Sequence, residues 1–301
     1  MALQGKIYNI ERYHIHDGDG IRTNIFMKGC GLSCPWCCNP ESQSFGNDLA
    51  VSMHKCVGCG RCISACPVHA ISIQDGNIVT DHKKCTSCGV CVKRCFHDAR
   101  TLFGQDMTVK EVMEEIRRDQ AYYVRSGGGV TFSGGEPSLQ ADFVNECMRL
   151  CKLEFINTAM ETCGGAPSDK MLKAAEYADT ILYDIKTFDD DKFQKFSSFS
   201  LRQVLDNVKL LRERGKYIIL RCPIIPSFNK TPEHIDRVID LALENGIHRI
   251  DVLPFHQLGS YKYKALGKSY ELSELPTLEK SSVAELAWRI ENASLTCVVG
   301  G

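Results

Sequence analysis

Three cysteines in the first part of the chain have the spacing of ligands for an iron–sulfur cluster that keeps one iron open. They are Cys30, Cys34 and Cys37. Three thiolates can hold three irons of a cubane and leave the fourth without a protein ligand, and an open metal position is a reaction site, as in catalytic zinc centres. Cys38 is an alternative fourth ligand, but neighbouring residues on an extended loop point apart, so we interpret it as a bystander.

Eight further cysteines form two runs with the spacing C-x2-C-x2-C-x3-C, which is typical of bacterial two-cluster ferredoxins. Pro67 follows the first run, whereas Phe96 stands in that place after the second. Because the fourth cysteine of each run ligates the other cluster, we expect two 4Fe–4S clusters. The expected ligands are Cys56, Cys59, Cys62 and Cys95 for one cluster, and Cys66, Cys85, Cys88 and Cys91 for the other. The alternative is a pair of zinc knuckles, which C-x2-C pairs also form.

The composition is that of a globular protein from a reducing compartment. The chain has 301 residues, 44% of them hydrophobic, and 17 cysteines, which in such a compartment indicate metal ligation or redox chemistry rather than disulfides. A formal net charge of -1 gives no field that would attract nucleic acid or a membrane surface. No apolar run approaches the roughly 18 residues of a spanning helix, and the start does not resemble a signal peptide. We therefore expect a cytoplasmic protein.

Strands and helices must hold these cysteines in place. The predicted strands and helices alternate along the chain. Apolar runs predict strands at 21–27, 129–132, 155–160, 180–183, 217–222, 249–253 and 295–299. Amphipathic stretches predict helices at 108–119, 138–151, 168–177, 201–214, 232–245 and 278–291. Repeated strand–helix units imply an α/β fold with a parallel sheet, here an incomplete barrel of about six units. Residues 51–101 would be an insertion, so that residues 1–50 and 102–301 together build the barrel.

Unusual residues recur directly after the predicted strands. They are 30–37, 133–137, 161–164, 184–186, Arg221 and 254–256. In a parallel barrel the carboxyl ends of the strands share one face, which is where such enzymes keep their sites. Each motif alone has an ordinary structural interpretation, such as a glycine turn, a surface ion pair or a hydrogen-bonded histidine. Their joint placement favours a single site.

The sequence resembles the radical S-adenosylmethionine (SAM) superfamily, through Cys30, Cys34, Trp36 and Cys37. Within it, the chain is most similar to those activating enzymes of glycyl radical enzymes that contain an inserted two-cluster ferredoxin domain. The shared stretches are 16–23, 36–42, 126–137, 184–186 and 253–259. The family usually has a histidine and a Thr-Gly-x-x-Asn pattern after Asp-x-Lys, and residues 188–200 lack both. Because that loop would shape recognition of the protein partner, its divergence leaves the identity of the partner open.

The resemblance implies an incomplete (β/α)6, TIM-like radical SAM barrel with three 4Fe–4S clusters and SAM. Cys30, Cys34 and Cys37 would hold the cluster whose open iron chelates SAM, and Lys186 would act with them in catalysis. The remaining implied contacts are those of the SAM amino group with Gly134, Gly135 and Glu136, of its carboxylate or ribose with Lys186, Arg221 and His256, of its adenine with Trp36, and of a monovalent cation with Asp184, Glu161 and Thr162.

The implied reaction is the reductive cleavage of SAM to methionine and a 5'-deoxyadenosyl radical, which takes a hydrogen from a backbone glycine of a partner glycyl radical enzyme. A ferredoxin or flavodoxin would donate the electron to a monomeric protein that works under anaerobic conditions. The inserted clusters would either relay electrons or dock the partner. Asp17 and Asp19 either contact the glycine-bearing peptide or form an ordinary Asp-Gly turn.

Two other functions fit parts of the pattern. The first is a radical SAM enzyme that modifies a small molecule or peptide and uses the inserted clusters as auxiliary sites. The second is a non-catalytic electron-transfer protein, which the eight ferredoxin-type cysteines would explain but the run of Cys30, Cys34 and Cys37 would not. The sequence does not name the substrate of the partner enzyme.

Overall fold

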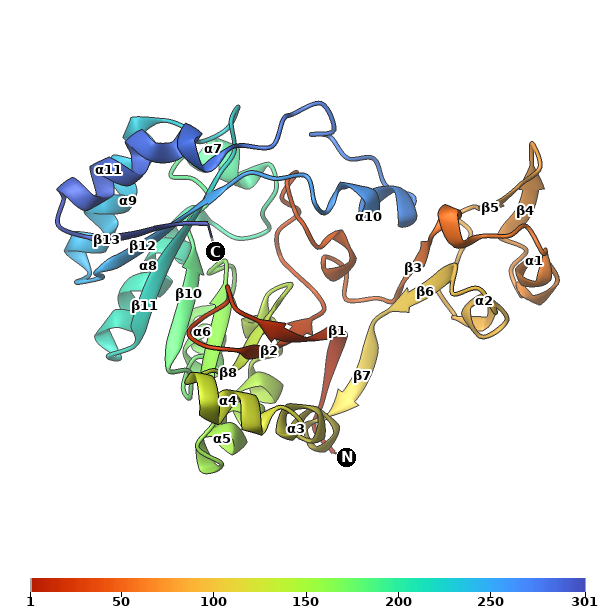
Figure 1. Ribbon diagram of the computed structural model, residues 1–301, viewed down its shortest axis with the longest axis horizontal. Coiled ribbons are helices and arrows are strands. Elements are labelled where there is room, and N and C mark those ends of the chain that lie inside the picture. Colours follow the sequence, from red (N-terminus) through yellow and green to blue (C-terminus); the bar gives the residue numbers. More distant parts are fainter. Residues whose placement is uncertain (1, 301) are drawn as a thin grey trace.

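The computed structural model describes residues 2–300 and has a nine-stranded sheet at its centre (Figure 1). In spatial order the strands are β13 (Thr296–Val299), β12 (Arg249–Pro254), β11 (Tyr217–Ile224), β10 (Thr180–Asp184), β9 (Asn157–Thr162), β8 (Gly129–Gly134), β2 (Arg22–Met27), β1 (Gln4–His14) and β7 (Gln105–Thr108). Neighbours from β13 to β2 pair in parallel, whereas β1 and β7 are antiparallel at one edge. The predicted α/β class with a parallel sheet is confirmed.

Helices follow the parallel strands and pack on the sheet through one continuous apolar core. They are α3 (Val109–Arg117), α4 (Gln120–Ser126), α5 (Ala141–Leu153), α6 (Ser168–Ala174), α7 (Asp190–Gln194), α8 (Leu201–Glu213), α9 (Pro232–Glu244), α10 (Ser260–Ala265) and α11 (Ala284–Asn292). Each predicted helix has a counterpart, although α11 begins after a 3-10 turn at residues 280–283. Within residues 2–300 no helix combines the length and apolarity that crossing a bilayer requires.

Two predictions about strands need correction. Strands β1 and β7 were not predicted: they are the last two strands at one end of the sheet and have many partly exposed residues, so their apolar pattern is weak. The strand predicted at 155–160 is β9, which begins at residue 157. Phe155 belongs to the turn after α5, because its backbone is left-handed (φ 57°) and its side chain is 98% exposed. A left-handed residue interrupts an extended strand.

The chain between β3 (Asp48–Val51) and β6 (Arg100–Phe103) forms a small lobe beside the sheet, drawn in orange and yellow in Figure 1. The two strands pair antiparallel, so the chain enters and leaves the lobe side by side. The lobe contains α1 (Arg61–Ala65), β4 (Ile71–Gln74), β5 (Asn77–Thr80) and α2 (Val90–Lys93) around its own apolar core. Residues 51–101, where the sequence predicts an insertion, lie within this stretch.

One buried amide fixes the loop that follows β9. Asn207 on α8 is 1% exposed. Its Nδ2 group donates hydrogen bonds of 3.0 Å to the carbonyl oxygens of Gly164 and Ala166. The hydroxyl of Ser168 donates to its Oδ1 atom at 2.7 Å. Helix α8 therefore holds in place one of the motifs that follow the strands.

We expect the substitution Asn207→Ala to lower the free energy of unfolding by about 1–3 kcal/mol, because two buried carbonyl groups lose their donor. Urea denaturation followed by circular dichroism measures the change. The control Asn292→Ala, at the exposed end of α11, should change stability by less than about 0.5 kcal/mol. Equal losses in the two variants would contradict an anchoring role for Asn207.

Candidate active site

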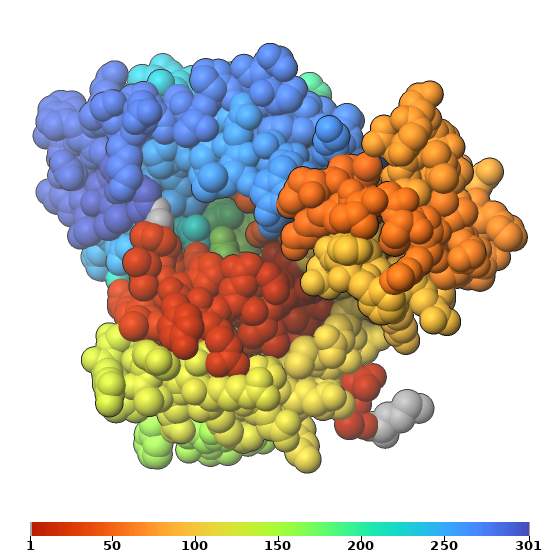
Figure 2. Space-filling view, turned by 45° about the vertical axis from the view of Figure 1, so that its right-hand side comes forward, coloured from red at the N-terminus to blue at the C-terminus, as the bar shows by residue number. Residues whose placement is uncertain are grey.

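The motifs that follow the strands converge on one cavity of about 440 Å³. In Figure 2 the molecule is hollowed between the red amino-terminal and the blue carboxy-terminal segments. Among the residues singled out from the sequence, those that line the cavity include Asp17, Cys30, Cys34, Trp36, Cys37, Cys38, Gly134, Gly135, Glu161, Thr162, Asp184, Lys186, Arg221 and His256. Its size is that of a small-molecule site.

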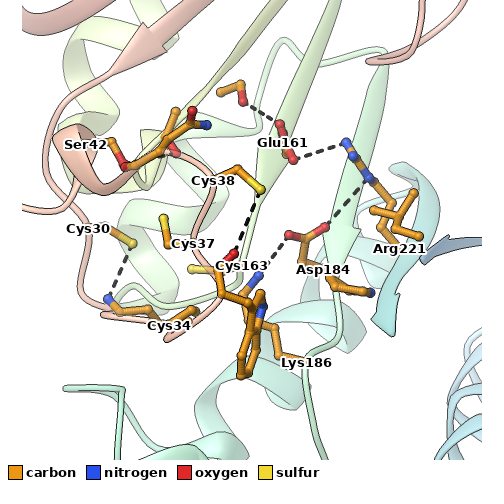
Figure 3. Close-up of a pocket in the computed structure, with 18 of the residues that line it drawn as sticks. Cys30, Cys34, Cys37, Cys38, Ser42, Glu161, Cys163, Asp184, Lys186 and Arg221 are labelled. Atoms are coloured by element: carbon orange, nitrogen blue, oxygen red, sulfur yellow. Dashed lines mark hydrogen bonds and ion pairs between the residues drawn. The ribbon is translucent and has the colours of Figure 1, made fainter. Parts of the chain in front are cut away.

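Three of the cavity's thiols come from the loop that leaves β2, and Figure 3 shows them on one side of the cavity. Burial raises the pKa of Cys34 to about 12 and raises that of Cys37 as well, so the free thiols are uncharged. A bound metal deprotonates a coordinating thiol outright, which suits these buried groups to metal ligation. The neighbouring Cys38 also lines the cavity, but its thiol lies 3.8 Å from the carbonyl oxygen of Trp36, to which it donates.

Close contact between the ends of β2 and β8 fixes where this cysteine loop begins. Gly134 has a φ of 102°, and a Cβ atom there would lie 2.6 Å from the carbonyl oxygen of Met27. A Cβ atom on Gly135 would lie 2.2 Å from the carbonyl oxygen of Gly29. The N–H of Gly135 donates to Met27, and that of Glu136 donates to Gly29, both at 2.8 Å. Glycine is therefore required at both positions for packing, in addition to lining the cavity.

Charged groups of opposite sign meet on the other side of the cavity (Figure 3). Arg221 Nη1 lies 3.1 Å from Glu161 Oε1 and 3.4 Å from Asp17 Oδ1. Arg221 Nε lies 3.8 Å from Asp184 Oδ1, while Lys186 Nζ lies 3.0 Å from Asp184 Oδ2. Three carboxyl groups thus face two cations, and burial raises the pKa of one of them, Glu161, above its ordinary value.

The surroundings keep most of this cluster ionised. Burial would raise the pKa of Asp17, but hydrogen bonding from His14 and the charge of Arg221 outweigh burial and lower that pKa to about 2. Burial would lower the pKa of Lys186, but the charge of Asp184 outweighs it and raises that pKa well above its ordinary value. The Oδ1 atom of Asp184 is buried without a hydrogen-bond donor in the part of the chain that the structure describes. A buried acceptor without a donor indicates a place for a bound cation or an N–H group.

An aromatic side chain and a histidine complete the lining. Trp36 is 8% exposed and packs against Phe196 and Phe228, with ring centroids 5.3 and 4.6 Å away. Burial lowers the pKa of His256, so its ring is neutral near pH 7. Because the N–H of Leu258 donates to its Nδ1 atom at 3.3 Å, the Nε2 atom holds the proton and can donate it to a ligand.

Glu136 departs from the role that the resemblance implies. Its side chain is fully buried and is not part of the cavity lining. Both carboxylate oxygens accept a 2.8 Å hydrogen bond from the Thr162 hydroxyl, and Oε2 also accepts from the N–H of Cys163 at 2.9 Å and from its thiol at 3.0 Å. These donors at the end of β9 occupy the carboxylate, so Glu136 ties β8 to β9 instead of facing a ligand.

Two features of the site were missed from the sequence. The thiol of Cys163 lines the cavity; it belongs to the stretch 161–164 that was expected at the site, but no role was assigned to it. The divergent loop 188–200 packs on the cysteine loop: Ser33 N–H donates to Phe196 at 2.7 Å, and Ser198 N–H donates to Gly31 at 2.9 Å. This loop was expected to shape partner recognition, and nothing in the local sequence indicates a contact with residues so distant in the chain.

Eight further cysteines line two small cavities in the lobe. Cys56, Cys59, Cys62 and Cys95 line one, and Cys66, Cys85, Cys88 and Cys91 line the other. These are the two sets of four that the spacing predicts, with the last cysteine of each run at the other cavity. Across residues 2–300, no three His, Cys, Asp or Glu side chains are arranged to hold a single metal ion.

Comparison with known proteins agrees with this site. A family model described as the radical SAM superfamily matches residues 24–242. The trans-4-hydroxy-L-proline dehydratase activating enzyme of Clostridioides difficile is 39% identical over 298 residues, which cover 98% of this chain and 99% of that protein. The pyruvate formate-lyase 2-activating enzyme of Escherichia coli (strain K12) is 34% identical over 296 residues, which cover 98% of this chain and 92% of that protein.

Among solved structures, Streptococcus suis SuiB bound to precursor peptide SuiA superposes with a TM-score of 0.50 at 19% identity, over 65% of this chain and 43% of that one. At this identity the likeness concerns the fold alone. The superfamily model, in contrast, covers more than half of the chain. Both activating enzymes match this chain almost from end to end. The chain therefore belongs to the radical SAM superfamily and, within it, to the activating enzymes of glycyl radical enzymes.

Proposed function

We propose that the cavity binds SAM beside a 4Fe–4S cluster held by Cys30, Cys34 and Cys37, and that the protein thereby generates a radical on a backbone glycine of a partner enzyme. The observation that supports this most directly is that these thiols and the charged groups after the strands line the same cavity. When bound, the cluster supplies the electron that cleaves SAM reductively. The residues of this chain would bind SAM, orient it beside the cluster and shield it from water.

The charged side of the cavity suits the methionine part of SAM. Lys186 and Arg221 supply positive charge for its carboxylate, and the donor-free Oδ1 atom of Asp184 is an acceptor for an amino group or a monovalent cation. Thr162, which the resemblance places near that cation, donates instead to Glu136.

The apolar part of the cavity suits the nucleoside. Trp36 is held on two sides by phenylalanine rings and offers a fixed aromatic surface to adenine. The Nε2 group of His256 is free to donate to the ribose or the carboxylate. Gly134 and Gly135 keep the amino-group side open, since any side chain there would collide with backbone. Glu136 acts from outside the cavity by holding Thr162 and Cys163.

For the lobe we propose a ferredoxin-type module with two 4Fe–4S clusters, inserted into an incomplete (β/α)6 barrel. The crossed grouping of its eight cysteines supports this assignment, because zinc knuckles built within one run would not need a cysteine from the other. The lobe would accept electrons from a ferredoxin or flavodoxin and pass them to the cluster in the cavity. The activator is proposed to be a cytoplasmic monomer.

The partner would present its glycine at the mouth of the cavity. Asp17 lines the cavity from the β1–β2 loop, where Asn24, His14 and Arg221 hold its carboxylate. Fixed in this way, Asp17 can accept a hydrogen bond from the backbone of an incoming peptide. The relatives activate enzymes with different substrates, so the partner's substrate is open.

The direct test is anaerobic incubation of the reduced protein with SAM and each glycyl radical enzyme encoded in the same genome. Electron paramagnetic resonance should then detect a glycyl radical on one of them. SAM cleavage with no radical on any of these proteins, together with a modified small product, would instead favour the alternative enzyme that acts on small molecules.

Removing one proposed cluster ligand tests whether that cysteine holds iron. We expect Cys34→Ala to contain about four fewer irons per chain than the wild type and to form no 5'-deoxyadenosine. The control Cys147→Ala removes a fully buried thiol on α5, outside the cavity, and should retain its iron. Full iron content in Cys34→Ala, measured by chemical iron and sulfide analysis, would argue against the assigned ligand.

A cysteine of the lobe distinguishes an electron relay from a docking module. If the lobe relays electrons, Cys88→Ala should lose activity with reduced flavodoxin but keep it with a strong chemical reductant. Loss with both reductants, while circular dichroism shows an intact fold, would favour docking. The control Cys297→Ala, on β13 of the sheet, should be active with both.

A further inference from the structure

A buried arginine lies between the two four-cysteine cavities of the lobe. Arg100 is 4% exposed and lines the cavity of Cys56, Cys59, Cys62 and Cys95. Its Nη1 group donates to the Thr80 hydroxyl at 3.0 Å and lies 4.0 Å from the sulfur of Cys91, which lines the other cavity. One guanidinium therefore adjoins both sets of cysteines.

The positive charge of Arg100 has no negatively charged side chain beside it among the described residues. In the part of the chain that the structure describes, no carboxylate lies within 4.0 Å of Arg100, and its buried Nη2 group has no hydrogen-bond acceptor. A buried, unpaired charge is strongly unfavourable. Only anionic groups in the two cavities would balance the charge of Arg100.

The internal repeat of the lobe shows that its fold does not need an arginine here. The first cysteine run is followed by Ala70-Ile71 at the same distance at which the second is followed by Ala99-Arg100. Ile71 is 5% exposed and belongs to the apolar core of the lobe. The equivalent position thus accepts an aliphatic side chain in one half and holds a cation in the other.

We propose that Arg100 is a shared counter-charge that raises the reduction potentials of the two lobe clusters, most strongly that of the cluster on Cys66, Cys85, Cys88 and Cys91. The proposal rests on the proposed function, in which both cavities hold 4Fe–4S clusters. Accepting one electron from the donor changes such a cluster from a charge of about -2 to about -3. A nearby positive charge stabilises the reduced form more than the oxidised form. An N–H group directed at a ligand sulfur acts in the same sense.

Arg100 would therefore influence where in the protein an electron from the donor is held. Each lobe cluster accepts one electron and is oxidised again when it passes that electron on. By favouring the reduced clusters, Arg100 keeps reducing equivalents in the lobe between turnovers. Arg100 acts only through its positive charge near the lobe clusters, and it touches neither SAM nor the reacting glycine.

The test is a potentiometric titration of the full-length, cluster-loaded protein, monitored by electron paramagnetic resonance. The signal that changes when SAM is added belongs to the cavity cluster and is set aside. We expect Arg100→Leu to lower the reduction equilibrium constant of a lobe cluster at least tenfold, which is 59 mV for a one-electron couple. Arg100→Lys keeps the charge but loses the fork of N–H groups, so it should shift the potential in the same direction by less.

The control Arg94→Leu makes the same change of charge at an exposed position that also lines one cavity. Solvent screening should limit its effect to less than threefold. Unchanged potentials in both Arg100 variants, or an equal shift in Arg94→Leu, would overturn the proposal. If Arg100→Leu fails to hold its clusters, the Arg100→Lys titration decides. Iron analysis tests the proposed function separately, since three clusters require about twelve irons per chain whatever the potentials are.

Discussion

The ends of β2 and β8 approach each other so closely that neither Gly134 nor Gly135 has room for a side chain. This contact depends on backbone atoms alone, and it fixes the point at which the cysteine loop leaves the sheet. From there Cys30, Cys34 and Cys37 reach one side of the cavity, and the loop 188–200 holds them from the outside through backbone hydrogen bonds. A methyl group at Gly135 would move the loop that bears the thiols away from the strands that bear the charged groups.

Arg221 performs the corresponding task on the other side of the cavity. Its guanidinium contacts acidic side chains from the β1–β2 loop, from β9 and from β10. Because these contacts are buried, they are screened less by salt than surface ion pairs and keep the three elements in register. The arrangement leaves one carboxylate oxygen of Asp184 without a donor. The framework of the site is therefore held by buried ion pairs, and one buried acceptor within it has no hydrogen-bond donor among the described residues.

The sequence predicts the cysteine groupings and the convergence of the strand-end motifs because both follow from short spacings and from the geometry of parallel strands. It does not predict the side on which Glu136 lies, since the donors that occupy its carboxylate come from Thr162 and Cys163 on the next strand. Nor does it predict the packing of Phe196 on Trp36, which joins segments far apart in the chain. Strands β1 and β7, at one end of the sheet, were not predicted because partial exposure weakens their apolar periodicity. Local patterns thus identify the reacting groups, whereas tertiary contacts decide which of them face the ligand.

The chain enters and leaves the lobe through the antiparallel pair of β3 and β6, in which Asp48 lies opposite Phe103. Residues opposite each other in such a pair have Cα atoms about 5 Å apart, a gap that a two-residue hairpin turn can close. Excising the lobe at this point would leave the path of every strand in the central sheet unchanged. The presence of the two clusters proposed for the lobe is therefore separable from the geometry of the cavity, and an ancestor could have gained or lost the whole lobe in a single insertion or deletion.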